Sequence, residues 1–231
     1  MLLSWLISFA GNSEEPWLVV TEYLPPFQYP TENGHITGTM TNVVRDILQE
    51  TELDADIVIM PWARAEHMAK NRPNTLIYSM LRTQKREDQF HWVGAIGMTT
   101  TSLFKLRSNH GLQLNSLSDI HRELIGVTRG DVVAKYLKGK LPLSNFQENI
   151  TTSDSVRMLI FGRVDLIPTS EEQLHHYCLV LQCQTSQFDK VIDLDEVEQV
   201  LYLAANKDSD PKMLSILTKL TSDKTFSNGG G

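Results

Sequence analysis

The stretch EYLPPFQYPTENGHITGTMTNVVRDILQE (residues 22–50) decides the fold, because it passes from strand end to turn to helix within one short unit. The β-rich run WLVVT (17–21) precedes it, and the prolines at 25–26 stop that strand. Asn33-Gly34 is a typical tight-turn signal. Apolar residues then follow the spacing of one helix face, at Met40, Val43, Val44, Ile47 and Leu48.

Strands and helices continue to alternate along the chain in two series. In the first series we predict a buried strand at ADIVIM (55–60), a helix at 61–70 and strands at 74–80 and 100–106. In the second series we predict the following elements: short helix 116–122, strand 124–128, helix 131–137, helix 153–162 with Ser153 as its N-cap, strand 164–170, helix 171–181, strands 190–194 and 201–206, and a last helix from Pro211. Short alternating units favour an α/β architecture with largely parallel sheets, and two series favour two lobes.

The composition narrows the choice of partners. The 231 residues carry a formal net charge of −7, which argues against a nucleic-acid partner because phosphate binding needs a basic face. The sequence contains no P-loop, metal-binding or Ser-His-Asp pattern, so we expect no cofactor and no metal. We also expect a monomer.

The N-terminal residues 1–10 form a short apolar segment that ends in Ser8-Phe9-Ala10, with small residues at the −3 and −1 positions of a candidate cleavage site. We interpret them as the remnant of a signal peptide, although a basic n-region is missing. The alternative is a buried N-terminal strand or helix. A signal peptide predicts a periplasmic location.

Two cysteines, Cys178 and Cys183, lie close together in HHYCLVLQCQ (175–184). In an exported protein, this spacing suits a local disulfide, and a pair of buried thiols is the alternative. A metal site is the weakest interpretation, because the adjacent His175 and His176 cannot share one helix face.

Five segments together resemble the bacterial extracellular solute-binding proteins of family 3, the amino-acid type. They are EYLPPFQYPTENGHITGTMTNVVRDILQE, RTQKREDQFHWVG (82–94), ELIGVTRGDVVAKYL (123–137), SVRMLIFGRVDLIPTS (155–170) and LYLAANKDSDPKMLSILTKL (201–220). The resemblance implies a type II periplasmic-binding-protein fold, in which two α/β lobes are joined by two crossing strands. A ligand cleft lies between the lobes, and hinge motion closes it. The implied lobes are 17–105 plus 193–231 and 108–190, with crossings near SLFKL and FDKVIDL.

The cationic stretch SMLRTQKRE (79–87) follows a predicted strand. The resemblance places Thr83 and Arg86 at the family's Thr-x-x-Arg step, where the arginine grips the ligand's α-carboxylate. A guanidinium suits this role, since its planar fork of donors matches a carboxylate. Alternatively, Arg86 caps a helix or pairs on the surface with a neighbouring acid. Arg82 either offers a second guanidinium to the cleft or points to solvent.

Other first-lobe candidates lie at strand ends, where ligands bind in open α/β sheets. Tyr78 and Ser79 would supply hydroxyl and backbone contacts. Trp62 would form an apolar wall, or else pack between helices, and Arg64 is either a further cleft cation or a surface residue. Two aromatic residues flank the prolines, and we expect one to stack on the ligand and the other to be core. They are Tyr23 and Phe27.

The second lobe departs from the amino-acid pattern. Where amino-acid binders commonly place an aspartate for the ligand ammonium, this chain has Ser170. Glu171, Glu172 and Glu22 are substitutes for that role. At the turn after 124–128, the resemblance places Thr128 and Asp131 near the ligand, and Asp131 either caps the helix or binds a cation. The several candidate cleft cations predict an anionic or zwitterionic solute.

The resulting hypothesis is a periplasmic protein that captures a small carboxylate-bearing solute and delivers it to an ABC-type permease. An amino acid, a short peptide and another small carboxylate all remain open as the solute. One alternative is a module that presents its solute to a membrane receptor. A dehydratase-like enzyme on the same fold is less favoured, because Glu22, Asp131 and Glu171 form no recognisable catalytic set.

Overall fold

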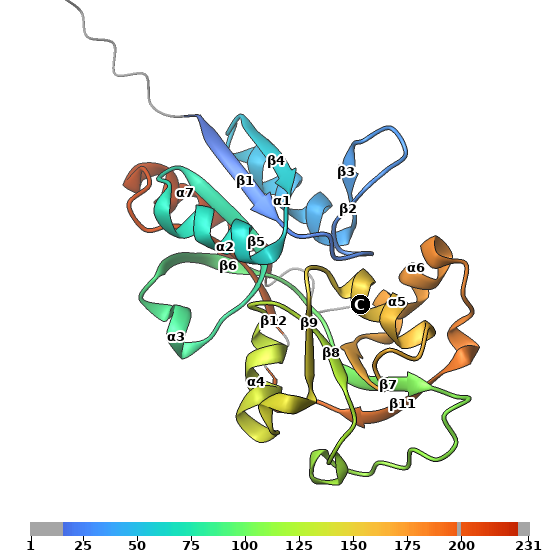
Figure 1. Ribbon diagram of the computed structural model, residues 1–231. Helices are drawn as coiled ribbons and strands as arrows, with labels where there is room; N and C mark the ends of the chain where they lie inside the picture. Colours follow the sequence, from blue (N-terminus) through green and yellow to red (C-terminus); the bar gives the residue numbers. More distant parts are fainter. Residues whose placement is uncertain (1–15, 198–199, 226–231) are drawn as a thin grey trace, which may run out of the picture.

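The computed structural model describes residues 16–197 and 200–225. It consists of two α/β bodies, each built around its own sheet (Figure 1). The segment 1–10, predicted to be a signal-peptide remnant, lies outside the described residues. Within the described part of the chain, no helix is long and apolar enough to cross a membrane. The two-lobed fold expected from the sequence is confirmed.

The first lobe contains a five-stranded sheet in the order β4-β1-β5-β12-β6. Strands β1 (Trp17–Thr21), β4 (Ala55–Ile59) and β5 (Thr75–Leu81) run parallel, whereas β12 (Val200–Asn206) and β6 (Phe90–Met98) are antiparallel to their neighbours. The prediction that 55–60 is fully buried was wrong. Strand β4 is at the edge of the sheet, and its residues alternate between half-buried and exposed.

Helices cover both faces of this sheet. On one face, α1 (Thr39–Glu50) and α7 (Pro211–Thr225) contact β6, and α1 buries the apolar stripe predicted from its spacing. On the other face, α2 (Trp62–Asn71) packs on β1, β5 and β12. The short hairpin β2 (Tyr29–Pro30) and β3 (Ile36–Thr37) precedes α1, and Gly34 has a positive φ of 79° in its turn.

In the second lobe, β7 (Ser102–Leu106) lies between β10 (Ile167–Thr169) and β11 (Phe188–Asp193). The parallel pair β8 (Ile125–Thr128) and β9 (Phe146–Asn149) joins them through a bridge between Ile125 and Leu166. The helices are α4 (Val132–Lys140), α5 (Thr152–Ile160) and α6 (Glu171–Leu181), and the 3-10 turns are Leu117–Asp119, Leu143–Asn145 and Thr185–Gln187.

Two predictions for the second lobe need correction. The helix expected at 116–122 is only the 3-10 turn Leu117–Asp119. The N-cap of α5 is Thr151 rather than Ser153, because Thr151 forms a reciprocal capping box with Asp154. A capping box satisfies two backbone N–H groups at once, so it sets the start of the helix two residues earlier.

The chain crosses between the lobes twice. It leaves β6 at Met98 and enters β7 at Ser102, so SLFKL itself belongs to the second sheet and residues 99–101 make the crossing. It returns between Asp193, where β11 ends, and Val200, where β12 begins. Both connections are short, which keeps the two sheets close together.

Cys178 and Cys183 form a disulfide in the structure. Cys178 lies in the last turn of α6, and the left-handed Gln182 (φ 56°) turns the chain back so that Cys183 meets it. The bond closes the C-terminal end of this helix. No group of three or more metal-binding side chains occurs in residues 16–197 and 200–225.

Gly38 is the position where backbone geometry most requires glycine. Its φ is 126°, and an added Cβ would lie 2.3 Å from the carbonyl oxygen of Phe27. We expect Gly38→Ala to lower the free energy of unfolding by about 2 kcal/mol or more. The strain of a positive φ in alanine adds to the overlap of its Cβ with the Phe27 carbonyl. Urea denaturation measures this change.

Gly139→Ala is the matched control. Gly139 is inside α4 and an added Cβ meets nothing within 4 Å, so alanine should stabilise the helix by about 0.5–1 kcal/mol. Equal effects of the two substitutions would contradict the assignment of strain to Gly38.

Candidate functional site: a polar cleft between the lobes

A cavity of about 70 Å³ lies between the lobes and is lined from both sides. First-lobe side chains include Glu22, Trp62, Ser79 and Arg86, and residues 99–101 of the crossing contribute threonines. The second-lobe side is polar and consists of Thr128, Asp131, Thr152, Thr169 and Gln173, together with Val133 and Pro168. Small-molecule sites usually hold roughly 300–1,000 Å³. The cavity is smaller than such sites, so the lobes lie close together in this conformation.

Direct contacts hold the lobes together beside this cavity. The ring of Tyr23 lies 6.2 Å from that of Tyr177, and the ring of Tyr29 lies 4.6 Å from that of His176, so the loop after β1 and the hairpin both touch α6. Tyr23 was one of two aromatic candidates for stacking on the ligand, and in this arrangement its ring packs against the other lobe.

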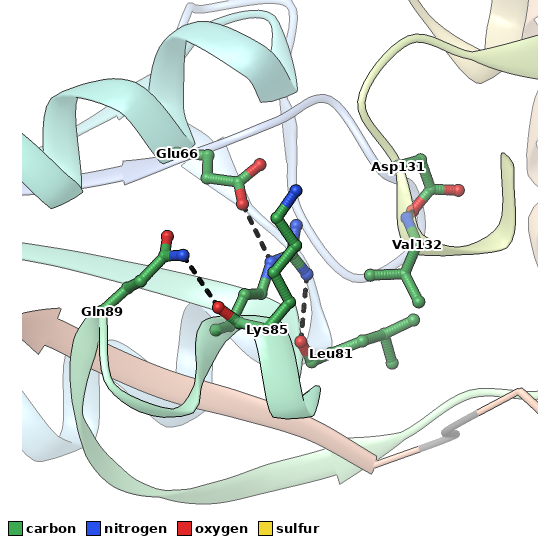
Figure 2. A network of polar contacts seen from close by, with 7 residues as sticks. Glu66, Leu81, Lys85, Gln89, Asp131 and Val132 are labelled. Atoms are coloured by element: carbon green, nitrogen blue, oxygen red, sulfur yellow. Dashed lines mark hydrogen bonds and ion pairs between the residues drawn. The ribbon is translucent and has the colours of Figure 1, made fainter. Parts of the chain in front are cut away.

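Arg86 is the cation of the cleft. It lies in the short α3 (Gln84–Glu87) after β5 and is only 3% exposed. Its Nε donates to Oε1 of Glu66 at 2.9 Å, and its Nη1 donates to the carbonyl oxygen of Leu81 at 3.0 Å (Figure 2). The guanidinium carbon lies 5.1 Å from the ring centre of Trp62. These contacts fix the plane of the guanidinium before any solute arrives.

One nitrogen of this guanidinium is left over. Nη2 of Arg86 and Nε1 of Trp62 are buried without a hydrogen-bond partner among the described residues. A buried donor that stays unpaired costs roughly 1–3 kcal/mol, so these two donors are candidates for contact with a ligand. Both residues line the cavity, and both donors suit a carboxylate oxygen.

Ser79 reaches the cleft because β5 contains a bulge. Its φ is 58°, and the pairing with β12 shifts register around it. Ile77 and Met80 consequently point to the face of the sheet that α2 covers. In a regular strand, Ser79 would lie on the same face as Ile77. The Ser79 hydroxyl donates to Oε1 of Gln28 at 2.8 Å. A left-handed non-glycine residue costs about 1–3 kcal/mol, which is typical of strain held at a functional site.

Tyr78 points the other way. It is fully buried in the core of the first lobe, and its hydroxyl lies 2.8 Å from the Thr41 hydroxyl. Burial raises the pKa of Tyr78 to about 12, so the phenol stays neutral. The structure therefore places Tyr78 in the core and not in the cleft.

Glu22 places a carboxyl in the cleft directly after β1. Burial is the main cause that raises the pKa of Glu22 from 4.5 to about 8, and the negative charge of Asp131 adds to it. The positive charge of Arg86 acts in the opposite direction. A cation beside Glu22 would lower this pKa, so its binding would favour loss of the proton.

Asp131 faces Glu22 from the second lobe. It is the N-cap of α4, where its Oδ1 accepts from the Val132 N–H at 2.6 Å, and it also lines the cavity. Burial raises the pKa of Asp131, while the backbone N–H of Val132 and the charge of Arg86 oppose the shift. From the sequence, helix capping and cation binding were alternative roles for Asp131. In this geometry both are possible, because Asp131 caps α4 and also lines the cavity.

Ser170 does not line the cleft cavity but a separate hollow. It is 4% exposed, and its hydroxyl accepts from the Gln173 N–H at 3.0 Å as the N-cap of α6. Gln173, one turn later, lines the cavity, and its Oε1 accepts from the Thr169 hydroxyl at 3.0 Å. Thr128 also lines the cavity and lies 3.0 Å from the Thr152 hydroxyl.

Several predicted site residues lie away from this cavity. Arg82 pairs with Glu87 and stacks over Trp92 and Tyr202, and Arg64 is exposed on α2. Phe27 is 2% exposed within the core, as expected for one of the two aromatic candidates. Thr83 is the N-cap of α3 and lines a separate groove.

Sequence reasoning missed a group of cleft residues, which are Leu24, Leu81, Thr99, Thr101, Val133, Thr152, Pro168, Thr169, Gln173 and Leu201. Most are threonines or aliphatic residues with no motif of their own. One signal was available, since S-x-x-Q at 170–173 is a capping box that starts a helix at the cleft.

Two α/β lobes with a charged cleft between them define the class of two-lobed solute-binding proteins. The chain belongs to the bacterial extracellular solute-binding proteins, family 3, whose sequence pattern matches residues 18–226. The family predicted from the five segments is confirmed.

Solved structures share this fold. An ancestral arginine-binding protein bound to arginine aligns with a TM-score of 0.75 and 18% identity, over 94% of this chain and 98% of that chain. The substrate-binding protein of an amino acid ABC transporter has a TM-score of 0.77, with 16% identity and 91% and 93% coverage. A histidine kinase sensor domain similar to periplasmic binding proteins has a TM-score of 0.77, with 15% identity and 92% and 91% coverage. A search of curated proteins gave no match.

The raised pKa of Glu22 predicts a pH dependence of stability. Between the ordinary value of 4.5 and about 8, the folded chain keeps a proton that the unfolded chain has lost. The contribution of protonated Glu22 to the free energy of unfolding is therefore complete below the pKa of the unfolded chain. It is lost as the pH rises through the pKa of the folded chain. We expect Glu22→Gln to raise the melting temperature relative to wild type more at about pH 8 than at about pH 5.

Glu32→Gln, at an exposed site in the β2–β3 turn, is the control and should shift the melting temperature equally at both pH values. Melting curves across the pH range measure the difference. A Glu22→Gln effect that does not change with pH would show that Glu22 is already ionised in the folded protein.

Proposed function

We propose that the protein captures a small solute that carries both a carboxylate and a protonated amine, such as an amino acid. The observation that carries this proposal is the charge layout of the cleft. The fixed guanidinium of Arg86 retains a free donor, and two carboxyl groups, Glu22 and Asp131, approach from opposite lobes.

This layout favours a zwitterion over a polyanion. The sequence suggested several cations in the cleft, but Arg82 and Arg64 lie on the surface. In the cavity lining, Arg86 therefore shares the cleft with two acids, Glu22 and Asp131. A solute carboxylate would pair with Nη2 of Arg86, and an ammonium group would lie between Glu22 and Asp131. Because these acids belong to different lobes, the ammonium would bridge the lobes and favour closure by hinge motion.

Delivery to an ABC-type membrane permease is the role we propose for the closed, loaded protein, in the periplasm or outside the cell. Membership in an extracellular solute-binding family supports this location. We propose that the protein captures and releases the solute as a monomer. It does not change the solute chemically and uses no cofactor. The cleft acids are then binding groups and not catalytic ones.

Presentation of the solute to a membrane receptor is the second candidate. The likeness to a histidine kinase sensor domain supports it, because a two-lobed fold of this kind also occurs within a receptor. Both roles share the same solute-binding step and differ only in the membrane protein that recognises the closed form.

The first test is a thermal-shift screen of amino acids against matched carboxylates that lack the amine. A solute that binds only the folded chain raises the melting temperature. We expect hits among the amino acids and none among their deaminated analogues. Calorimetry near pH 7 in two buffers of different ionisation enthalpy should also detect proton release, because an ammonium beside Glu22 lowers its pKa. Hits confined to amine-free carboxylates would refute the zwitterion assignment.

Arg86→Lys tests the guanidinium directly. Lysine keeps the charge but loses the planar fork that reaches Glu66, Leu81 and a carboxylate together. We expect the affinity for the best amino acid from the screen to fall by about 2–5 kcal/mol, measured by calorimetry.

Arg82→Lys, four residues earlier on the surface, is the matched control and should leave the affinity within about twofold of wild type. Equal losses in the two variants, or an unchanged affinity in Arg86→Lys, would remove Arg86 from the binding site.

A further inference from the structure

A second, larger hollow lies on the other side of Arg86. It is an open groove of about 630 Å³ between α2 and α3 of the first lobe and α4 of the second. Arg86 belongs to the lining of both the groove and the cleft, so the two hollows meet at this residue. The solute-binding role described above makes no use of this groove.

Cations dominate the groove. Lys70 comes from α2, Lys85 from α3 and Lys135 from α4, and none of them forms an ion pair within the described ranges 16–197 and 200–225. Figure 2 shows Lys85 extending from α3 in the direction of Glu66. Glu66 is the acid in the lining, and it is already paired with Arg86 at 2.9 Å. The groove is therefore locally cationic, although the chain as a whole carries a formal net charge of −7.

The lysines come from opposite lobes, so closure brings like charges together. Desolvation is the main cause that lowers the pKa of Lys135; the charges of Glu66 and Asp131 oppose this shift, and those of Arg86 and Lys85 add to it. Lys85 and Arg86 repel Lys135 across the groove, while Glu66 and Asp131 attract it. An anion between the lysines would replace this repulsion with attraction to both lobes.

We propose that this groove binds an oxyanion, a carboxylate or phosphate group, between Lys85 of the first lobe and Lys135 of the second. Neutral donors complete the surroundings, since Thr83, Gln89 and Tyr136 also line the groove. The oxyanion comes either from a free small anion or from a second acidic group of the cleft solute. Binding of a free anion does not depend on the proposed function of the cleft.

The test uses the full chain with citrate as the probe, titrated against sodium chloride of equal ionic strength. We expect citrate to raise the melting temperature more than the chloride control does. The excess should fall to about a third or less in Lys85→Gln/Lys135→Gln, since each exposed ion pair contributes a few-fold in affinity. Lys219→Gln, an exposed lysine on α7, should keep the full citrate response.

A second arm separates the two sources by comparing L-glutamate with L-glutamine, which differ in one charge. A larger shift with glutamate that the double variant loses assigns the oxyanion to the solute, whereas a citrate response alone assigns it to a free anion. If citrate acts no better than chloride and glutamate no better than glutamine, the proposal is wrong. It is also wrong if the double variant, still folded by circular dichroism, keeps both wild-type responses. Failure of every amino acid to bind would refute the cleft proposal and leave the citrate test intact.

Discussion

The candidate site depends on the contacts that hold the guanidinium of Arg86 in one position. A free arginine side chain would lose considerable rotamer freedom on binding a solute. Here the Glu66 carboxylate, the Leu81 carbonyl and the Trp62 ring restrict it in advance. That arrangement leaves Nη2 with unused hydrogen-bonding capacity at the boundary between the lobes. In the proposed binding mode, a solute carboxylate would relieve the cost of this unpaired buried donor.

The two lobes contribute different chemistry around this cation. The first lobe holds Arg86 and Glu22 just after strands, and the second lobe presents Asp131 together with hydroxyl and amide groups from β8, α5, β10 and α6. In the proposed binding mode both lobes are needed, because the two acids that would hold an ammonium group come from different lobes. In that binding mode the charges around the solute come from both lobes, which would link recognition of the solute to closure.

The sequence predicted the elements better than it predicted the directions of side chains. Amphipathic spacing located α1, and apolar runs located β1 and β5, because burial of a whole face is a strong, repeated signal. By contrast, Arg82 and Arg86 belong to one cationic run, and only the four-residue α3 turns one to the surface and the other inward. Tyr78 and Ser79 were equally plausible until the bulge at Ser79 separated them. Such local backbone irregularities leave no periodic trace.

The position of β12 in the first sheet has a consequence for the order in which the chain can fold. Residues 200–206 lie between β5 and β6, although almost the whole second lobe separates them from those strands along the chain. Until the ribosome has delivered this segment, the partner edges of β5 and β6 are open, and the first sheet cannot close. The second lobe is contiguous and can complete its core first. A chain with this topology can therefore complete its second lobe while the first sheet still waits for its fourth strand in the order β4-β1-β5-β12-β6.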